Sequence, residues 1–162
     1  METEDVSFAV VRFESGVQVS VVNSVVSPRE TSYLRFDFTD ATVEVEHLYG
    51  YDNSNWRWTP APHVTDAAVS AAWLPEENVP SSHTAQLREL LDSLERRERP
   101  RASGADGRRT LEFVTGMYRS AITGRPVLRA ELTTDDPFYS SMAGPDADAA
   151  RRVFTGREVS HV

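Results

Sequence analysis

The chain of 162 residues has a formal net charge of −8, and it contains neither cysteine nor lysine, so all seventeen of its basic residues are arginine. The missing cysteines exclude disulfides, thiolate metal sites and thiol nucleophiles, and the missing lysines exclude Schiff-base chemistry. A chain with a surplus of acidic residues is poorly suited to a phosphate backbone, so we expect no nucleic-acid partner.

The sequence also carries no sign of a membrane or secretory segment. The first residues, METEDVSF, are acidic and lack the basic and apolar regions of a secretory signal. No apolar run approaches the ~20 residues that a membrane span needs. We therefore expect a cytoplasmic location and no membrane partner.

Two segments near the N-terminus have the composition of paired strands. Val6 to Glu14 and Val17 to Val26 are rich in valine and phenylalanine, and Ser15-Gly16 between them predicts a tight hairpin turn. The first segment is apolar on both faces, which is typical of a central strand covered on both sides. Pro28 then interrupts the pattern, because proline has no backbone N–H to donate.

A second pair of strands shows a clean alternation of side chains. Residues 32–38 are apolar on one face and polar or amphipathic on the other: Leu34, Phe36 and Phe38 against Tyr33, Arg35 and Asp37. After a turn at Thr39-Asp40, residues 42–46 alternate in the same way. The four strands predict a mostly antiparallel sheet whose apolar face is core and whose opposite face meets solvent or a second subunit.

The stretch LYGYDNSNWRWTPAPH, residues 48–63, is the best candidate for a binding surface. Trp56 and Trp58 share one strand face, opposite Arg57, and indole rings can stack on a sugar or on a partner side chain. The alternative, which is the more common situation, is that these aromatic residues simply close the edge of a sheet. Residues 64–80 predict an irregular connection with a short helix at 65–72.

Two amphipathic helices follow. Ser82 can cap the first, which carries a stripe of His83, Leu87, Leu90, Leu91 and Leu94. His83 lies in the first turn, where the helix dipole favours a neutral ring, and a purely structural histidine is the alternative to a binding role. Asp106 predicts the N-cap of the second helix, and Gly124 with Pro126 predicts its end.

The second helix has one apolar stripe and a small notch. The stripe consists of Leu111, Val114, Met117, Tyr118, Ala121 and Ile122. Gly116 and Ser120 lie four residues apart, so a neighbouring element can approach there, unless both are merely tolerated surface residues. Beyond it we expect a strand at 127–132, a turn or short helix at 136–139 and a short helix at 146–154.

Four segments, in this order, resemble a known family: DVSFAVVRFESGVQVSVVNSV, TSYLRFDFTDATVEVEHLYG, HTAQLRELLDSL and DGRRTLEFVTGMYRSAITGRPV. They are similar to the C-terminal domain of the glucose–fructose oxidoreductase, inositol dehydrogenase and rhizopine-catabolism (Gfo/Idh/MocA) family. The resemblance covers most of Asp5 to Val127. It implies an α+β domain at residues 1–135, an open-faced, mostly antiparallel sheet with two main helices on one face, and an extension at 136–162.

The same resemblance implies a two-domain enzyme of which only the second half is present. The family's Rossmann domain holds NAD or NADP, but no two glycines of this chain form the G-x-G of a dinucleotide site. The family's catalytic lysine cannot exist here, and none of the four histidines follows an aspartate by four residues. We expect no catalytic residue, no bound cofactor and no metal site in this chain alone.

Two functions are open on these grounds. The first is the substrate-contacting and oligomerisation domain of an NAD(P)-dependent oxidoreductase that acts on a sugar, polyol or related hydroxyl compound, with its Rossmann domain separate or missing. The second is a free-standing, non-catalytic binding or assembly module. Under the first we expect Tyr49, Trp58 and His83 to contact substrate, and a homo-oligomer to form through the open sheet face with Tyr33, Arg35 and Asp37.

Overall fold

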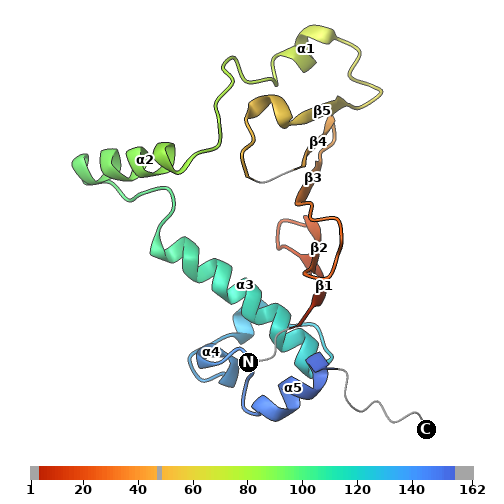
Figure 1. Cartoon of the computed structure of the whole chain (residues 1–162), viewed down its shortest axis with the longest axis vertical. Coiled ribbons are helices and arrows are strands. Elements are labelled where there is room, and N and C mark those ends of the chain that lie inside the picture. Colours follow the sequence, from red (N-terminus) through yellow and green to blue (C-terminus); the bar gives the residue numbers. More distant parts are fainter. Residues whose placement is uncertain (1–3, 47–48, 156–162) are drawn as a thin grey trace. The chain divides into compact units, whose positions relative to one another are not determined.

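The computed structural model describes residues 4–46 and 49–155, so His47 and the last seven residues of the expected extension lie outside the described part (Figure 1). The chain divides into two compact units. One combines residues up to 27 with those from 102 onward, and the other comprises residues 28–101. Both ends of the chain contribute to the first unit, and the expected domain at residues 1–135 with an extension at 136–162 stays a prediction.

A hairpin opens the first unit. Strands β1 (Val6–Arg12) and β2 (Gln18–Ser24) pair antiparallel, from Val6 opposite Ser24 to Arg12 opposite Gln18. Gly16 adopts a φ of 88° in the turn, a conformation that glycine reaches without strain. The predicted strands and their turn are thereby confirmed, but the expected central position of the first strand is wrong, because β1 belongs to a two-stranded sheet and Phe8 and Val10 are exposed.

Helix α3 (Gly104–Thr123) is the long element of this unit. Its N-cap is Ser103 rather than Asp106, which lies at the third helical position. The Asp106 carboxylate accepts from the Ser103 backbone N–H at 3.0 Å, so the two residues form a capping box that starts the helix three residues earlier than predicted. The predicted end is confirmed, because Gly124 is the C-cap with a left-handed φ of 65°.

The segment after α3 packs back onto it. A 3-10 turn, η2 (Arg129–Glu131), replaces the strand expected at 127–132, because the Glu131 carboxylate accepts from Leu128 N at 2.9 Å and curls the backbone. Helices α4 (Pro137–Ser140) and α5 (Ala147–Thr155) confirm the two short helices expected there. Leu132 and Phe138 are buried, and Leu132 reaches the notch at Gly116.

A buried arginine ties this segment together. Arg119 of α3 is 8 % exposed, and its Nη2 donates to Glu131 Oε2 at 3.0 Å. Its Nη1 lies 3.0 Å from Asp136 Oδ2 as an ion pair without an aligned hydrogen bond. Asp136 in turn caps α4 by accepting from Phe138 N at 2.8 Å. One cation therefore joins α3 to both η2 and α4.

The second unit contains a three-stranded antiparallel sheet. Strands β3 (Tyr33–Asp37), β4 (Ala41–Glu46) and β5 (Arg57–Pro60) are ordered β3-β4-β5. The pairs Phe36 with Val43 and Val43 with Trp58 place one apolar residue from each strand side by side. The predicted antiparallel pairing of these two strands, β3 and β4, is confirmed, and the apolar residues of β4 are buried, whereas all five residues of β3 are exposed.

Three helical elements complete the second unit: η1 (Asn53–Asn55), α1 (Ala67–Ala71) and α2 (His83–Glu95). Ser82 caps α2 as predicted, with its Oγ accepting from Ala85 N at 3.3 Å. Asp66 caps α1 within the range expected for a short helix. The leucine side chains of α2 stay exposed.

The α+β class is confirmed, and the described strands pair antiparallel throughout. They form two sheets, of two and three strands, in place of the single sheet of at least four. The chain turns after β2, where Val26 N and Ser27 Oγ both donate to Ser24 Oγ at 3.3 Å, and Pro28 follows. Helix α3 packs against η2, α4 and α5 of its own unit.

Candidate functional site

The apolar face of the β3-β4-β5 sheet carries an open groove. Its volume is about 380 Å³. Seven side chains from β3, β4, η1, β5, the residues that flank these elements and the segment before α2 line it: Phe36, Phe38, Val43, Asn53, Trp56, Trp58 and Pro75. None of these seven residues is charged. A groove of this lining suits an uncharged molecule with a flat or apolar face.

The aromatic rings of the groove are ordered by the strand alternation. Phe36 and Phe38 stack with ring centroids 6.4 Å apart, and Phe36 and Trp56 stack at 6.5 Å. Tyr51 meets the edge of Trp56 at 6.3 Å. Residues two apart in an extended segment share a face, so Phe36 at the end of β3 and Phe38 just after it lie on the same side of the sheet. Among the described residues, the buried Nε1 of Trp58 has no hydrogen-bond partner.

Asp52 holds the rim of the groove. Its carboxylate accepts from Ser54 Oγ at 2.6 Å and from Asn78 Nδ2 at 2.8 Å, and these bonds lower the pKa of Asp52. Asn53 Nδ2 donates to Glu77 O at 2.8 Å, which fastens the segment after α1 to η1. The rim is therefore built by polar contacts, whereas the groove itself is apolar.

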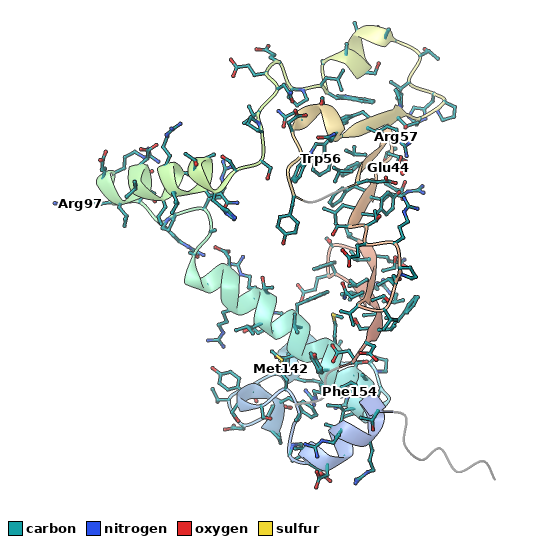
Figure 2. The ribbon with its side chains drawn as sticks, in the orientation of Figure 1. Glu44, Trp56, Arg57, Arg97, Met142 and Phe154 are labelled. Atoms are coloured by element: carbon teal, nitrogen blue, oxygen red, sulfur yellow. The ribbon has the colours of Figure 1, made fainter. Side chains whose placement is uncertain are left out.

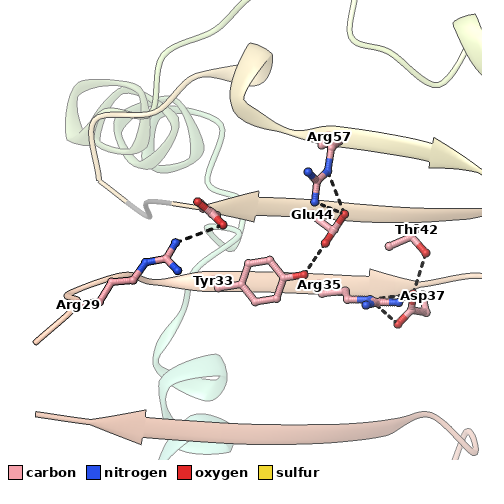
Figure 3. Close-up of polar contacts among 8 residues, drawn as sticks. Arg29, Tyr33, Arg35, Asp37, Thr42, Glu44 and Arg57 are labelled. Atoms are coloured by element: carbon pink, nitrogen blue, oxygen red, sulfur yellow. Dashed lines mark hydrogen bonds and ion pairs between the residues drawn. The ribbon is translucent and has the colours of Figure 1, made fainter. Parts of the chain in front are cut away.

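The opposite face of the sheet is a polar network (Figure 3). Glu44 of β4 accepts from the Tyr33 hydroxyl on one side and from Arg57 Nη2, at 2.7 Å, on the other. Arg35 donates to Asp37, and Thr42 Oγ1 donates to the same carboxylate at 2.7 Å. Trp56 and Arg57 are neighbours in the chain, yet Trp56 lines the groove and Arg57 joins this network (Figure 2).

These contacts shift the pKa values in the directions that keep the carboxylates ionised and the Tyr33 hydroxyl protonated. The Tyr33 hydroxyl and then Arg57 lower the pKa of Glu44, and the hydrogen bond to Glu44 raises the pKa of Tyr33. Arg35 and then Thr42 lower the pKa of Asp37. At neutral pH the face therefore presents ionised carboxylates, each already matched by a donor.

The three residues expected to contact substrate do not form one cluster. Trp58 lines the groove and is half-buried, and Tyr49 is 88 % exposed. His83 is exposed, and its Nδ1 lies 3.2 Å from Gln86 Oε1 on its own helix. The backbone links their surroundings, because Ser81 N donates to Tyr51 O at 2.8 Å, but neither Tyr49 nor His83 lines the groove.

The sequence-based reading missed the contribution of strand β3 to this site. Phe36 and Phe38 were assigned to the core, but they are 44 % and 64 % exposed and line the groove beside Trp56. The cross-strand register is the signal that brings them together, since Val43 pairs with both Phe36 and Trp58. The three residues expected at an oligomer interface, Tyr33, Arg35 and Asp37, are all exposed on the polar face.

The first unit has a smaller pocket, of about 240 Å³, between α3 and the segment that packs on it. Arg108 lies at its edge with its guanidinium carbon 5.7 Å from the centre of the Tyr139 ring. Arg108 and Arg129 both donate to Glu112 at 2.9 Å, and they lower the pKa of that carboxyl. These charges are satisfied within the chain, so the pocket offers less to a ligand than the groove does.

The described residues show neither a metal-binding cluster nor a membrane-spanning helix. In the described ranges 4–46 and 49–155, no three histidine, aspartate or glutamate side chains converge as a metal site would require. No helix of the described chain is long and apolar enough to cross a membrane. Comparison of the chain with protein-family models, with curated proteins and with solved structures found no match.

Proposed function

We propose that the chain is the substrate-contacting and oligomerisation domain of an NAD(P)-dependent oxidoreductase that acts on a sugar, polyol or related hydroxyl compound. The proposal combines the resemblance of residues 5–127 to the Gfo/Idh/MocA C-terminal domain with one structural observation, the aromatic groove. In it the chain binds substrate, and a separate Rossmann domain supplies NAD or NADP and the catalytic residues. A cytoplasmic location is part of the same proposal.

The groove supports the substrate part of this proposal. Sugars and cyclic polyols present apolar C–H faces, and stacked aromatic rings such as Phe36 and Trp56 bind such faces by dispersion and by exclusion of water. The lining carries no charge, which matches a neutral hydroxyl compound better than a phosphorylated one. In this assignment Trp58 remains a contact residue, joined by Trp56 and Phe36, and Tyr49 and His83 lie outside the groove.

The polar face supports the oligomerisation part. Tyr33, Arg35 and Asp37 are exposed on one flat sheet face, and Glu44 holds the Tyr33 side chain in place. Side chains that are already held by bonds within the chain lose little conformational freedom when a second copy covers them. The expected assembly is a homo-oligomer that joins these faces.

The test is a titration of the chain with neutral polyols, glucose and myo-inositol being the probes, followed by tryptophan fluorescence. Trp56→Ala and Trp58→Ala should abolish a saturable change that the wild-type chain shows. Trp73→Phe is the matched control, because Trp73 does not line the groove, and it should leave the change intact. Saturable binding that survives loss of both groove tryptophans would place the ligand elsewhere.

The second candidate is a free-standing, non-catalytic binding or assembly module of the same fold. It is favoured by one observation, that every residue lining the groove belongs to the unit of residues 28–101. Calorimetry with NAD and NADP separates the two roles when a Rossmann-domain partner is added: the first candidate requires dinucleotide binding and polyol oxidation by the mixture but neither by this chain alone. Polyol binding that no such partner alters favours the second.

A further inference from the structure

Two uncovered apolar surfaces lie in the same unit. The first is the β3 side of the apolar sheet face, where Leu34, Phe36 and Phe38 are 39 %, 44 % and 64 % exposed, whereas Val43 and Val45 of the central strand β4 are buried. The second is the stripe of α2, where Leu87, Leu91 and Leu94 are about 60 % exposed. Both surfaces belong to residues 28–101, and each is the kind of surface that folding normally removes from water.

The chain holds the start of α2 at the rim of the groove. Ser81 N donates to Tyr51 O at 2.8 Å, and Asp52 forms a β-bridge with Pro80. Asn53, the next residue after Asp52, lines the groove. Helix α2 begins at His83, only two residues beyond the last of these anchors.

A joint between the anchor and the helix is provided by Ser82. This residue is the N-cap of α2 and has an extended backbone, with φ −153° and ψ 148°. On its N-terminal side the segment is fixed, because Asn78 and Glu77 bond to Asp52 and Asn53. Rotation at Ser82 changes the direction of the whole helix and leaves both the anchor and the intrahelical bonds intact.

We propose that α2 is a cover that swings at Ser82 and lays its leucine stripe over the aromatic groove. The two surfaces match in chemistry, since neither the groove lining nor the stripe of Leu87, Leu90, Leu91 and Leu94 carries a charge. They also match in length. A 13-residue helix is ~20 Å long and its stripe spans ~10 Å, which is enough to cross a three-stranded sheet.

The cover competes with any ring that enters the groove. This consequence rests on the proposed function of the groove, whereas the closure itself does not. If the groove binds a neutral polyol, replacing Leu87 and Leu91 by serine weakens the cover and tightens polyol binding several-fold. The closed state regulates access to the same aromatic rings.

Closure can be tested by disulfide trapping, because the chain has no cysteine of its own. Phe36→Cys with Leu91→Cys, and Leu34→Cys with Leu94→Cys, each place one thiol on the sheet face and one on the stripe. Mild oxidation at low protein concentration should give a fast-migrating, reducible monomer for at least one of the two pairs. The control pairs Phe36→Cys with Glu89→Cys, because Glu89 lies on the opposite side of α2, and it should give at least tenfold less.

Each outcome decides the proposal. No intramolecular product from either pair, or equal product from the Glu89 control, would overturn it. A product found only as a disulfide-linked dimer would also overturn it, since the groove would then accept α2 of a second copy. Failure of polyol binding with efficient trapping would remove the proposed function and leave the cover standing.

A second readout avoids cysteines altogether. In the closed state the leucine stripe shields Trp56 from water, so Leu87→Ser with Leu91→Ser should shift the tryptophan emission to longer wavelength. The control variant Glu89→Ala should leave the emission unchanged. Identical spectra for wild type and the leucine variant, with the far-ultraviolet circular dichroism preserved, would contradict closure.

Discussion

Helices α3 and α2 share one amphipathic sequence pattern, but the apolar side of each helix has a different environment. Both begin at a serine N-cap and both carry apolar residues at spacings of three and four. The stripe of α3 meets later parts of its own unit, where Leu132 reaches Gly116 and the ring of Phe154 meets the ring of Tyr118 at 5.5 Å. The leucines of the α2 stripe remain exposed instead.

The difference shows what an amphipathic pattern determines. Periodicity fixes which side of a helix is apolar, but the partner of that side depends on what the chain does next. After α3 the chain returns through η2, α4 and α5, and Arg119 fastens the return with two ion pairs. After α2 it continues into α3 through a polar connection, which leaves the leucines available for the groove.

The largest expected effect comes from breaking the return of the chain onto α3. Arg119→Met removes a buried cation that two carboxylates share, and leaving Glu131 and Asp136 without it should cost about 3 to 5 kcal/mol of unfolding free energy. Chemical denaturation of the purified chain measures this loss. Arg129→Met, which removes an exposed ion pair with Glu112, is the control and should cost much less.

A smaller effect is expected at Gly144, which lies against Phe138 in the same unit. Its φ is 66°, and a Cβ there would lie 2.7 and 2.8 Å from Phe138 Cε1 and Cε2. Gly144→Ala should therefore cost about 3 kcal/mol, the sum of backbone strain and a steric clash. Gly124→Ala shares the positive φ but meets open space, so only the strain, about 1 kcal/mol, should appear in its denaturation curve. Equal losses for both variants would show that Phe138 does not hold this turn.

The N-cap of α2 tests how the exposed helix of this pair is stabilised. Ser82→Ala removes the acceptor for Ala85 N, which should cost about 1 kcal/mol of local helix stability. Because the leucines of α2 are exposed, this loss should appear as faster hydrogen exchange of α2 amides rather than as a lower global stability. Ser82→Asp keeps a capping oxygen and should restore protection. Unchanged exchange in the alanine variant would mean that tertiary contacts hold the helix.

The smallest effect concerns the polar face of the sheet. The folded-state pKa of Glu44 lies below the value of 4.5 of the free side chain, because Tyr33 and Arg57 donate to the carboxylate. This carboxylate therefore stabilises the fold above pH 4.5, and the contribution disappears as the pH falls through the lowered pKa. Denaturation curves at pH 7 and pH 3.5 should differ more for the wild type than for Glu44→Gln. An identical pH dependence of both proteins would exclude this contribution.

Local features of this chain, such as strand alternation and helix ends, could be predicted from the sequence. The contacts between segments that are distant in the sequence could not. The alternation at 33–38 places Phe36 and Arg35 on opposite faces, as the structure does, and Gly124 ends α3 where expected. The start of α3 was predicted three residues too late, because serine and aspartate are both good N-caps. Only the hydrogen bonds between Ser103 and Asp106 show that Ser103 is the N-cap and Asp106 the third helical residue.

The candidate site was predicted in part for the same reason. Trp56 and Trp58 lie two apart and must share a face, so their common position in the groove follows from strand geometry. Phe36 and Phe38 lie beside these tryptophans because of the register of β3 with β4 and of β4 with β5. That register cannot be derived from the sequence pattern of a single strand. His83 and Tyr49 were expected beside Trp58 because a sheet edge and the first turn of a covering helix can converge, but neither lines the groove.

Strand β5 ends in Pro60, and this residue makes the two edges of the three-stranded sheet unequal. Proline offers no N–H to an approaching strand, and β5 is only four residues long, so this edge resists extension. The β3 edge contains no proline and presents a longer backbone. Any incoming strand should therefore pair with β3, so the sheet can gain strands at one edge only.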